Sequence, residues 1–302
     1  IAEFMKLPSG VGRRKTHICT MWENMVFLIR YCFTENRAWV VLRVVSLVRK
    51  RRGKGLLNLR FKWVVISSLF YVMYAVPKAE YMLRHPERYT DEEKFAFAMK
   101  IVGHMKKRAR TETLVYGAEN IPDDQGYIMY GNHQGKYDAL GILLSLDRPC
   151  GVLWEKKQAS RFLSRQVCGL INGVAIDLTD IRAKVRSIKE VSDRVKDGQN
   201  FLIFPEGGYA DNHNELQEFF SGCFACSQAS KGPIVPVVVY DSYKSMNSNT
   251  FEKVTTQVHY LRPIYYNEYQ GMKKPEICEL VKSRISTKLE EIKNCEREKK
   301  VI

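Results

Sequence analysis

A histidine and an aspartate five positions apart, His133 and Asp138 in the stretch YGNHQGKYDAL, are the residues of this sequence best suited to chemistry. A neutral imidazole can take a proton from a hydroxyl group, and a carboxylate on its other ring nitrogen fixes the tautomer and stabilises the imidazolium. Asn132 and Gly135 indicate a tight turn into a helix over residues 137–145, with Asp138 in its first turn. The alternative is that Asp138 only starts the helix and His133 is an ordinary loop residue.

A second candidate group lies in the stretch FPEGGY, residues 204–209. Pro205 ends a predicted strand, and Glu206 is a single carboxylate directly after it. Gly207 and Gly208 would let backbone amides approach an anion closely, because they carry no Cβ. The alternative is a plain turn after a strand.

The elements that must position these groups are short β-rich runs alternating with amphipathic helical patterns from about residue 95 onward. Apolar residues recur at helical spacing over residues 181–195, 216–223 and 277–292, and residues 267–276 are expected to form a loop. This alternation predicts an α/β domain with a largely parallel sheet flanked by helices. The predicted strands are residues 113–117, 127–131, 151–154, 174–178, 201–204, 234–240 and 256–262.

Ligands of such sheets bind beyond the carboxyl ends of the strands. His133 and Asp138 follow one predicted strand, Asp177 and Arg182 another, and Glu206 a third. We therefore expect the three groups to converge at one edge of the sheet.

The first part of the chain, residues 5–86, has a different character. Residues 21–33, 38–48 and 61–77 are apolar, and the uncharged run 64–76 is closed by Pro77. That run is shorter than the roughly 20 residues that a membrane-crossing helix needs. Its aromatic residues and its flanking cations favour a helix at a membrane interface, with a buried helix of a soluble domain as the alternative. The flanking cations are Arg60, Lys62 and Lys78.

The composition limits the class of protein. With 45% hydrophobic and 27% charged residues, the 302-residue chain is globular rather than disordered. The net charge of +15 comes largely from clusters at residues 12–15, 48–55 and 105–110, which suit nucleic acid, anionic lipid or acidic substrates, or simply solvated faces. The four residues before Met5 are interpreted as a vector-derived remnant, and no secretory signal peptide is expected after them.

The eight cysteines are scattered, as expected of reduced thiols in a cytoplasmic setting. Only Cys223 and Cys226 form a CxxC pair. The pair falls in a predicted helix without a second ligand pair nearby, so we expect core packing rather than a metal or redox site, and no metal elsewhere.

Taken together, the motifs resemble the PlsC-type glycerolipid acyltransferases, which include the 1-acyl-sn-glycerol-3-phosphate (lysophosphatidic acid) acyltransferases. The resemblance rests on NHQGKYD followed by FPEGG, supported by GVAID (173–177), FFSGCFACSQAS (219–230) and PIVPVVV (233–239). It implies that His133 is the general base and that Asp138 orients it. The acceptor hydroxyl would then attack the thioester of acyl-CoA or acyl-acyl-carrier protein directly, with no acyl-enzyme and no further cofactor. Backbone amides of residues 131–135 are candidate donors to the oxyanion.

The chain departs from the family pattern at two positions. Leu178 stands where the family has an arginine after its Ile-Asp pair, and Gly208 and Tyr209 replace a Thr-Arg pair. Both changes remove bidentate phosphate ligands. Lys157 and three other cations could compensate, or the acceptor could be a different lysolipid or amphiphile. The predicted acceptor site consists of Glu206, Gly207, Gly208, Arg182, Lys136 and Lys156, with Asn132 and Gly135 as the supporting turn.

The resemblance also implies an organisation and a location. Residues 5–86 would form a membrane-docking region and residues 87–302 the acyltransferase domain, acting in phospholipid biosynthesis at the cytoplasmic face of the cell membrane, peripheral or shallowly embedded. The expected partners are an acyl thioester donor, possibly on acyl carrier protein, a lysophospholipid acceptor and an anionic membrane surface, but no nucleic acid. Two rivals stay open: a thioesterase-like hydrolase, although the chain has no Gly-x-Ser-x-Gly motif, and a basic binding module without catalysis.

Overall fold

A seven-stranded sheet forms the centre of the protein in the computed structural model, which describes residues 59–301. The strand order is β1-β7-β6-β2-β5-β3-β4. Neighbouring strands are parallel except β6 and β7, so β1 and β7 run opposite to the other five. The predicted class, α/β with a largely parallel sheet, is confirmed. The strands are β1 Thr111–Tyr116, β2 Ile128–Gly131, β3 Cys150–Glu155, β4 Val174–Ile176, β5 Asn200–Ile203, β6 Ile234–Tyr240 and β7 Val254–Tyr260.

All seven predicted strands are present, and no boundary differs by more than two residues. The central strands are apolar on both faces because helices cover both faces. In β6, for example, Val235 and Val237 belong to the core on one side of the sheet, and Ile234 and Val238 to the core on the other.

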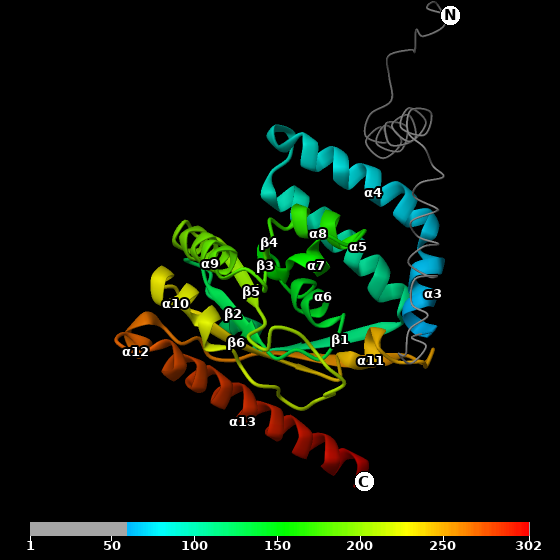
Figure 1. Cartoon of the computed structure of the whole chain (residues 1–302). Coiled ribbons are helices and arrows are strands. Elements are labelled where there is room, and N and C mark those ends of the chain that lie inside the picture. The colour runs from blue at the N-terminus through cyan, green and yellow to red at the C-terminus, as the bar shows by residue number, and fades with distance from the viewer. Residues whose placement is uncertain (1–58, 302) are drawn as a thin grey trace, which may run out of the picture. The chain divides into compact units, whose positions relative to one another are not determined.

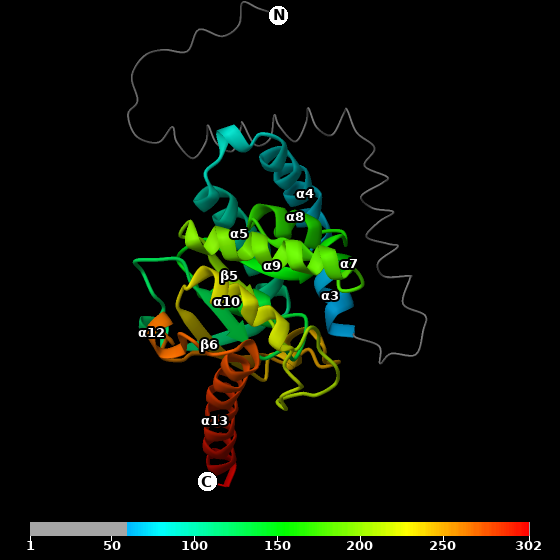
Figure 2. The same ribbon diagram turned by 60° about the vertical axis from the view of Figure 1, so that its left-hand side comes forward.

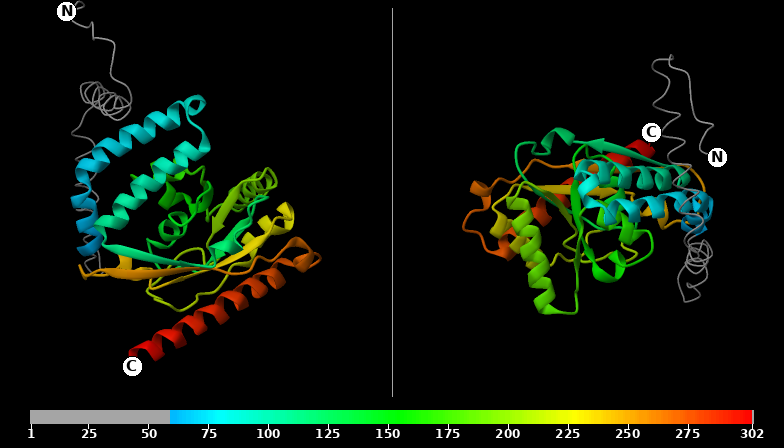
Figure 3. Two further views of the ribbon diagram at one scale, coloured as in Figure 1. Left: turned by 180° about the vertical axis from the view of Figure 1, so that it is seen from behind. Right: turned by 90° about the horizontal axis from the view of Figure 1, so that it is seen from above.

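Helices form a layer on each side of the sheet (Figures 1 and 3). One layer holds α4 (Leu69–Arg84), α5 (Asp91–Arg108), α6 (Asp138–Leu143) and α8 (Ser164–Leu170). The other holds α9 (Ile181–Lys196), α10 (Ala225–Ser230), α12 (Tyr266–Tyr269) and α13 (Lys274–Val301). The remaining short elements are α3 (Leu59–Ser67), α7 (Lys156–Ala159), α11 (Tyr243–Met246), η1 (Pro86–Arg88), η2 (Ala118–Asn120) and η3 (Ser221–Phe224).

The long helices follow the sequence pattern. The buried residues of α13 include those that recur at helical spacing, from Ile277 to Ile292. The start of α5 is set by a capping box, in which the Thr90 side chain accepts from the Glu93 N–H and Glu93 accepts from the Thr90 N–H.

Two local predictions are wrong. Residues 216–220 are not helical, and the helix predicted over residues 216–223 is reduced to the short η3. The reason is that this segment bonds to the loop after β5: the Phe220 N–H donates to the Pro205 carbonyl, and Gln217 donates to Glu206. The predicted loop 267–276 contains α12 and the start of α13.

The CxxC cysteines pack as expected. Cys226 lies in the core behind the sheet, where burial raises the pKa of its thiol to about 12. A thiol with such a pKa is protonated at neutral pH and is a poor nucleophile or metal ligand.

Residues 59–84 form two helices, α3 and α4, that meet at an angle of 68° (Figure 1). The sequence predicted that Pro77 closes the apolar run. In the structure, Pro77 lies inside α4. Burial of Val72, Val76 and Ala79 on either side of it offsets the backbone hydrogen bond that proline cannot make. Arg60 is not an exposed flanking cation: it is buried, and its guanidinium donates to the carbonyls of Ala109, Thr250 and Glu252.

The other face of this helix pair is exposed. The side chains of Leu59, Trp63, Ile66 and Phe70 lie at the surface. Among the described helices none is by itself long and apolar enough to cross a membrane, whereas α3 and α4 together pass that test of length and composition as one bent pair. The predictions for residues 1–58 lie outside the described residues, and the boundary between residues 86 and 87 stays a prediction.

Candidate active site

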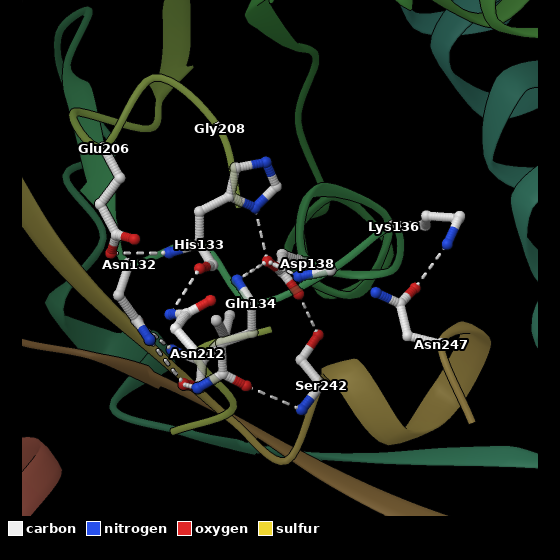
Figure 4. A network of polar contacts seen from close by, with 12 residues as sticks. Asn132, His133, Gln134, Lys136, Asp138, Glu206, Gly208, Asn212, Ser242 and Asn247 are labelled. Carbon is white, nitrogen blue, oxygen red and sulfur yellow. Dashed lines mark hydrogen bonds and ion pairs between the residues drawn. The ribbon is translucent and has the colours of Figure 1, made fainter. Parts of the chain in front are cut away.

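The His133 imidazole and the Asp138 carboxylate are in direct contact, with 2.6 Å between Nδ1 and Oδ2. His133 lies in the loop after β2, and Asp138 is the first residue of α6. The carboxylate is fully buried, whereas the imidazole keeps 17% of its surface exposed. Because Asp138 accepts the Nδ1–H bond, the lone pair of His133 lies on Nε2, which points away from the aspartate (Figure 4). The pair therefore presents one basic nitrogen to the surface of the protein.

Asp138 is held by three further donors. The backbone N–H groups of Gln134 and Gly135 donate to Oδ2, the latter at 2.8 Å, and the Ser242 hydroxyl donates to Oδ1. Such donors fix the plane of the carboxylate. Asp138 is thus an anchored carboxylate rather than only a helix-start residue.

Glu206 approaches the same loop from β5. Its Oε1 accepts from the His133 N–H at 3.0 Å, and its Oε2 accepts from the Gln217 amide. Burial raises the pKa of the Glu206 carboxyl to about 7, because these hydrogen bonds offset the loss of solvent only in part. Gly207, directly after it, has φ of +69°, which a glycine adopts without strain. Glu206 therefore fixes the backbone of the histidine.

Buried amides join this loop to the end of β6. Asn132 donates to the Val239 carbonyl at 3.0 Å and accepts from the Val239 N–H at 2.8 Å. Gln134 also donates to Val239, and its carbonyl oxygen accepts from the Ser242 N–H (Figure 4). These bonds extend the pairing of β2 with β6 beyond the last strand residue, so the predicted supporting turn is fastened to the neighbouring strand.

The His133 ring lies between two aromatic rings. It stacks on Phe204 with the ring centroids 4.3 Å apart, and it meets Tyr209 in a T-shaped contact with the centroids 4.8 Å apart. The Lys136 ammonium lies 5.9 Å from the centre of the Tyr209 ring, 5.5 Å from that of Phe61, and donates to Asn247. Of the predicted acceptor-binding cations, Lys136 is thus linked to the histidine through a shared neighbour.

The other predicted cations lie at the same edge of the sheet but on outer strands. Lys156 follows β3 and pairs with Asp177 at 3.3 Å, and Arg182 lies in the first turn of α9 after β4. In the sheet, β5 and then β3 separate β2 from β4. The predicted convergence at one edge is confirmed, while these two cations are exposed and stand apart from the pair.

Three of the expected oxyanion donors are engaged elsewhere. The N–H groups of His133, Gln134 and Gly135 already donate to Glu206 or Asp138. They position the carboxylates instead.

Sequence reasoning missed three residues of this network, namely Gln134, Gln217 and Ser242. Only one weak signal pointed to any of them: Ser242 follows the predicted strand 234–240 at the same edge of the sheet. Nothing in the local sequence indicated the two glutamines.

The comparisons with known proteins agree with this geometry. The family model described as Acyltransferase matches residues 112–240, which include β2, β5, β6 and the His–Asp pair. The 1-acyl-sn-glycerol-3-phosphate acyltransferase alpha of Ovis aries is 25% identical over 193 residues, covering 63% of this chain and 67% of the relative. The 1-acyl-sn-glycerol-3-phosphate acyltransferase of Borreliella burgdorferi is 25% identical over 191 residues, covering 61% of this chain and 74% of the relative.

A solved structure has the same fold. The 1-acyl-sn-glycerophosphate acyltransferase PlsC from Thermotoga maritima matches with a TM-score of 0.62 at 20% identity, covering 79% of this chain and 95% of that one.

The matched family model and the named relatives indicate an enzyme that transfers acyl groups to oxygen, and the His–Asp pair at the carboxyl edge of the sheet lies inside the matched region. The family model over residues 112–240, these relatives and the shared fold support the resemblance to the PlsC-type acyltransferases that the sequence motifs indicated.

Proposed function

We propose that this protein transfers a fatty acyl group from an acyl thioester to the free hydroxyl of 1-acyl-sn-glycerol-3-phosphate, giving phosphatidic acid. His133 Nε2 takes the proton of the acceptor hydroxyl while the hydroxyl oxygen attacks the carbonyl carbon of the thioester. The carbon–sulfur bond then breaks, and the His133 imidazolium returns the proton to the leaving thiolate. The observation that carries this proposal is the anchored His–Asp pair with one ring nitrogen turned away from the aspartate.

Direct transfer without an acyl-enzyme is supported by the surroundings of the imidazole. In the described part of the chain, the ring contacts the side chains of Asp138, Phe204 and Tyr209. A serine or cysteine nucleophile would have to lie within hydrogen-bonding reach of the base. The nearby Ser242 hydroxyl instead donates to the far oxygen of Asp138.

The acceptor is proposed from the names of the relatives, which act on 1-acyl-sn-glycerol-3-phosphate. Its phosphate needs cations, and Lys136 lies closest to the pair through Tyr209. We assign Lys136 as the cation that binds the phosphate. Lys156 and Arg182 are further cations at the same edge of the sheet, more distant from the pair. The donor is acyl-CoA or acyl-acyl-carrier protein, and no further cofactor takes part.

The exposed apolar residues of α3 and α4 support a membrane location. An enzyme with this acceptor must take one substrate from a bilayer and the other from the cytosol. Leu59, Trp63, Ile66 and Phe70 would lie in the lipid interface, at the cytoplasmic face of the membrane.

Product analysis tests the proposal. Purified protein is mixed with several lysolipids and with acyl-CoA or acyl-acyl-carrier protein, and the products are identified by mass spectrometry. We expect phosphatidic acid from wild type and a loss of roughly 1000-fold in His133→Ala. The control is His85→Ala, which removes another partly exposed histidine at the end of α4.

Three outcomes would contradict the proposal. Free fatty acid without acylated acceptor would make the enzyme a thioesterase. Acylation of a different lysolipid only would replace the acceptor and keep the reaction. Substantial activity in folded His133→Ala would overturn the mechanism.

A further inference from the structure

The apolar stripe of α9 is longer than the surface that it covers. Its second half packs on the sheet, with Val191 and Val195 buried. Its first half continues the same stripe, since residues four apart lie on one face of a helix. Yet Ile181 is 76% exposed and Val185 is 63% exposed. Two turns of apolar surface therefore extend beyond the protein's own core.

The sheet topology fixes the position of these exposed apolar residues. β4 ends at Ile176, and Leu178, between β4 and α9, is 41% exposed. Because β4 is parallel to β3, β5 and β2, this is the edge at which His133 lies. Leu178, Ile181 and Val185, named here the α9 patch, thus lie at the active-site edge of the sheet.

Phe220 is a further exposed apolar residue, and it lies beside the Glu206 loop. Its side chain is 64% exposed, and its ring lies beside Gly207. The segment that follows it packs on α9, where the Cys226 thiol contacts the Ile188 carbonyl. An exposed apolar side chain therefore lies beside the turn that holds the histidine, in a segment that leads into the helix packed on α9.

The charged residues around the α9 patch are mostly positive. Arg182, Lys184, Arg186 and Lys189 alternate with the apolar residues along the first half of the helix. Asp180 at the helix start is the N-cap and lies 3.9 Å from Arg186. An apolar stripe with a cationic margin is complementary to a surface of acyl chains beneath anionic headgroups, whereas an RNA or DNA backbone offers no partner to the apolar residues.

A second apolar surface lies on the other side of the active site. In Figure 1, α9 and α3 are at opposite sides of α6, and Figure 2 shows the first turns of α9 on the same side of the molecule as α7 and α3. The exposed residues of α3 include Trp63 and Ile66. One flat surface can touch both sides, and a bilayer is such a surface.

We propose that the first two turns of α9, with Leu178, Ile181 and Val185, dock onto an anionic lipid bilayer and form a second membrane contact opposite α3 and α4. This contact rests on the proposed function, because it holds the active-site edge against the source of the acceptor. It also accounts for Leu178, which offers an apolar side chain where the related enzymes are expected to hold a cation.

Vesicle flotation of the full chain tests the contact. The vesicles are phosphatidylcholine with about a third phosphatidylglycerol, or phosphatidylcholine alone. We expect Ile181→Ser/Val185→Ser to lower partitioning onto the anionic vesicles roughly tenfold. Arg186→Gln should lower it about threefold on anionic vesicles and leave it unchanged on neutral ones. The control Leu114→Ser/Val115→Ser removes two exposed apolar side chains of β1, each 38% exposed, and should change partitioning less than twofold.

Activity on a short-chain acceptor, kept below its micelle concentration, separates this contact from the catalytic proposal. Ile181→Ser/Val185→Ser should keep wild-type turnover there and lose it on vesicle-bound acceptor. Equal partitioning of wild type and the double variant would overturn the contact, as would equal losses in the β1 control. If wild type binds the vesicles more strongly than the double variant but acylates no lysolipid, the proposed function is wrong and the membrane contact is still supported.

Discussion

The two halves of the active site are built differently. The half that carries the proposed base, His133, lies at the central strands β2, β5 and β6, where Asp138 and Gln134 are buried and engaged in hydrogen bonds. The half that carries the outer cations lies at β3 and β4, where the Lys156 side chain is 69% exposed and Arg182 is exposed.

This difference fits the two tasks. Proton transfer requires atoms fixed within tenths of an ångström, and a buried network provides that. Binding of a phosphate by exposed cations is screened by water and depends little on exact placement, so one cation can stand in for another. It is on the outer half that Leu178 replaces an expected arginine.

The largest effect is expected from exchanging one carboxylate in each half. Asp138→Asn should lower kcat roughly 1000-fold or more, because a neutral amide at His133 Nδ1 cannot stabilise the imidazolium that forms during proton transfer. Asp177→Asn, which breaks the ion pair with Lys156, should change kcat less than about threefold. Steady-state kinetics with both variants compares the halves, and similar losses would remove the distinction.

The next effect concerns stability and pH at Glu206. Its folded pKa, about 7, is raised above the ordinary value of 4.5, so the folded state holds its proton more tightly than the unfolded state. This contribution is full below about pH 4.5 and is lost as the pH rises through 7.

We therefore expect wild type to lose roughly 2 kcal/mol more unfolding free energy than Glu206→Gln between pH 5 and pH 8. Urea unfolding of both proteins at each pH gives this difference. If the unfolding free energies of the two proteins change equally with pH, ionisation of Glu206 does not destabilise the folded state. Glu218→Gln, at an exposed glutamate, is the matched control.

A smaller effect is expected from the hydroxyl behind the aspartate. Ser242→Ala removes the donor to Asp138 Oδ1 and should lower kcat about tenfold while leaving KM unchanged. Ser245→Ala is the control, because Ser245 is also buried but bonds to Thr111 instead. If both variants lose the same activity, the loss reflects general destabilisation and not the orientation of the carboxylate.

The smallest effects are expected among the cations. Lys136→Ala should raise KM for the lysophospholipid about fivefold with kcat nearly constant, because this ammonium lies near Tyr209 beside the base. Lys156→Ala and Arg182→Ala should each raise it less than about twofold. A larger effect from either outer cation would move the phosphate toward β3 and β4.

The sequence predicted the strands well, since β-branched runs such as residues 234–240 have few other stable arrangements. It failed at residues 216–223, where an apolar spacing of helical type is overridden by hydrogen bonds from Gln217 and Phe220 to the Glu206 loop. It also took Arg60 for a surface cation, because nothing local shows that three carbonyl groups surround it.

The sequence by itself determined the class of chemistry, because His133, Asp138 and Glu206 each follow a recognisable strand, and the order of those strands sets the type of fold. Only the tertiary structure decided which atoms meet. Ser242 reaches Asp138 across 104 positions of the chain, because β6 lies beside β2 and Ser242 follows β6 at the same edge of the sheet. Local patterns encode which face of an element is buried, whereas contacts between distant loops depend on strand order and register, which no short stretch of sequence contains.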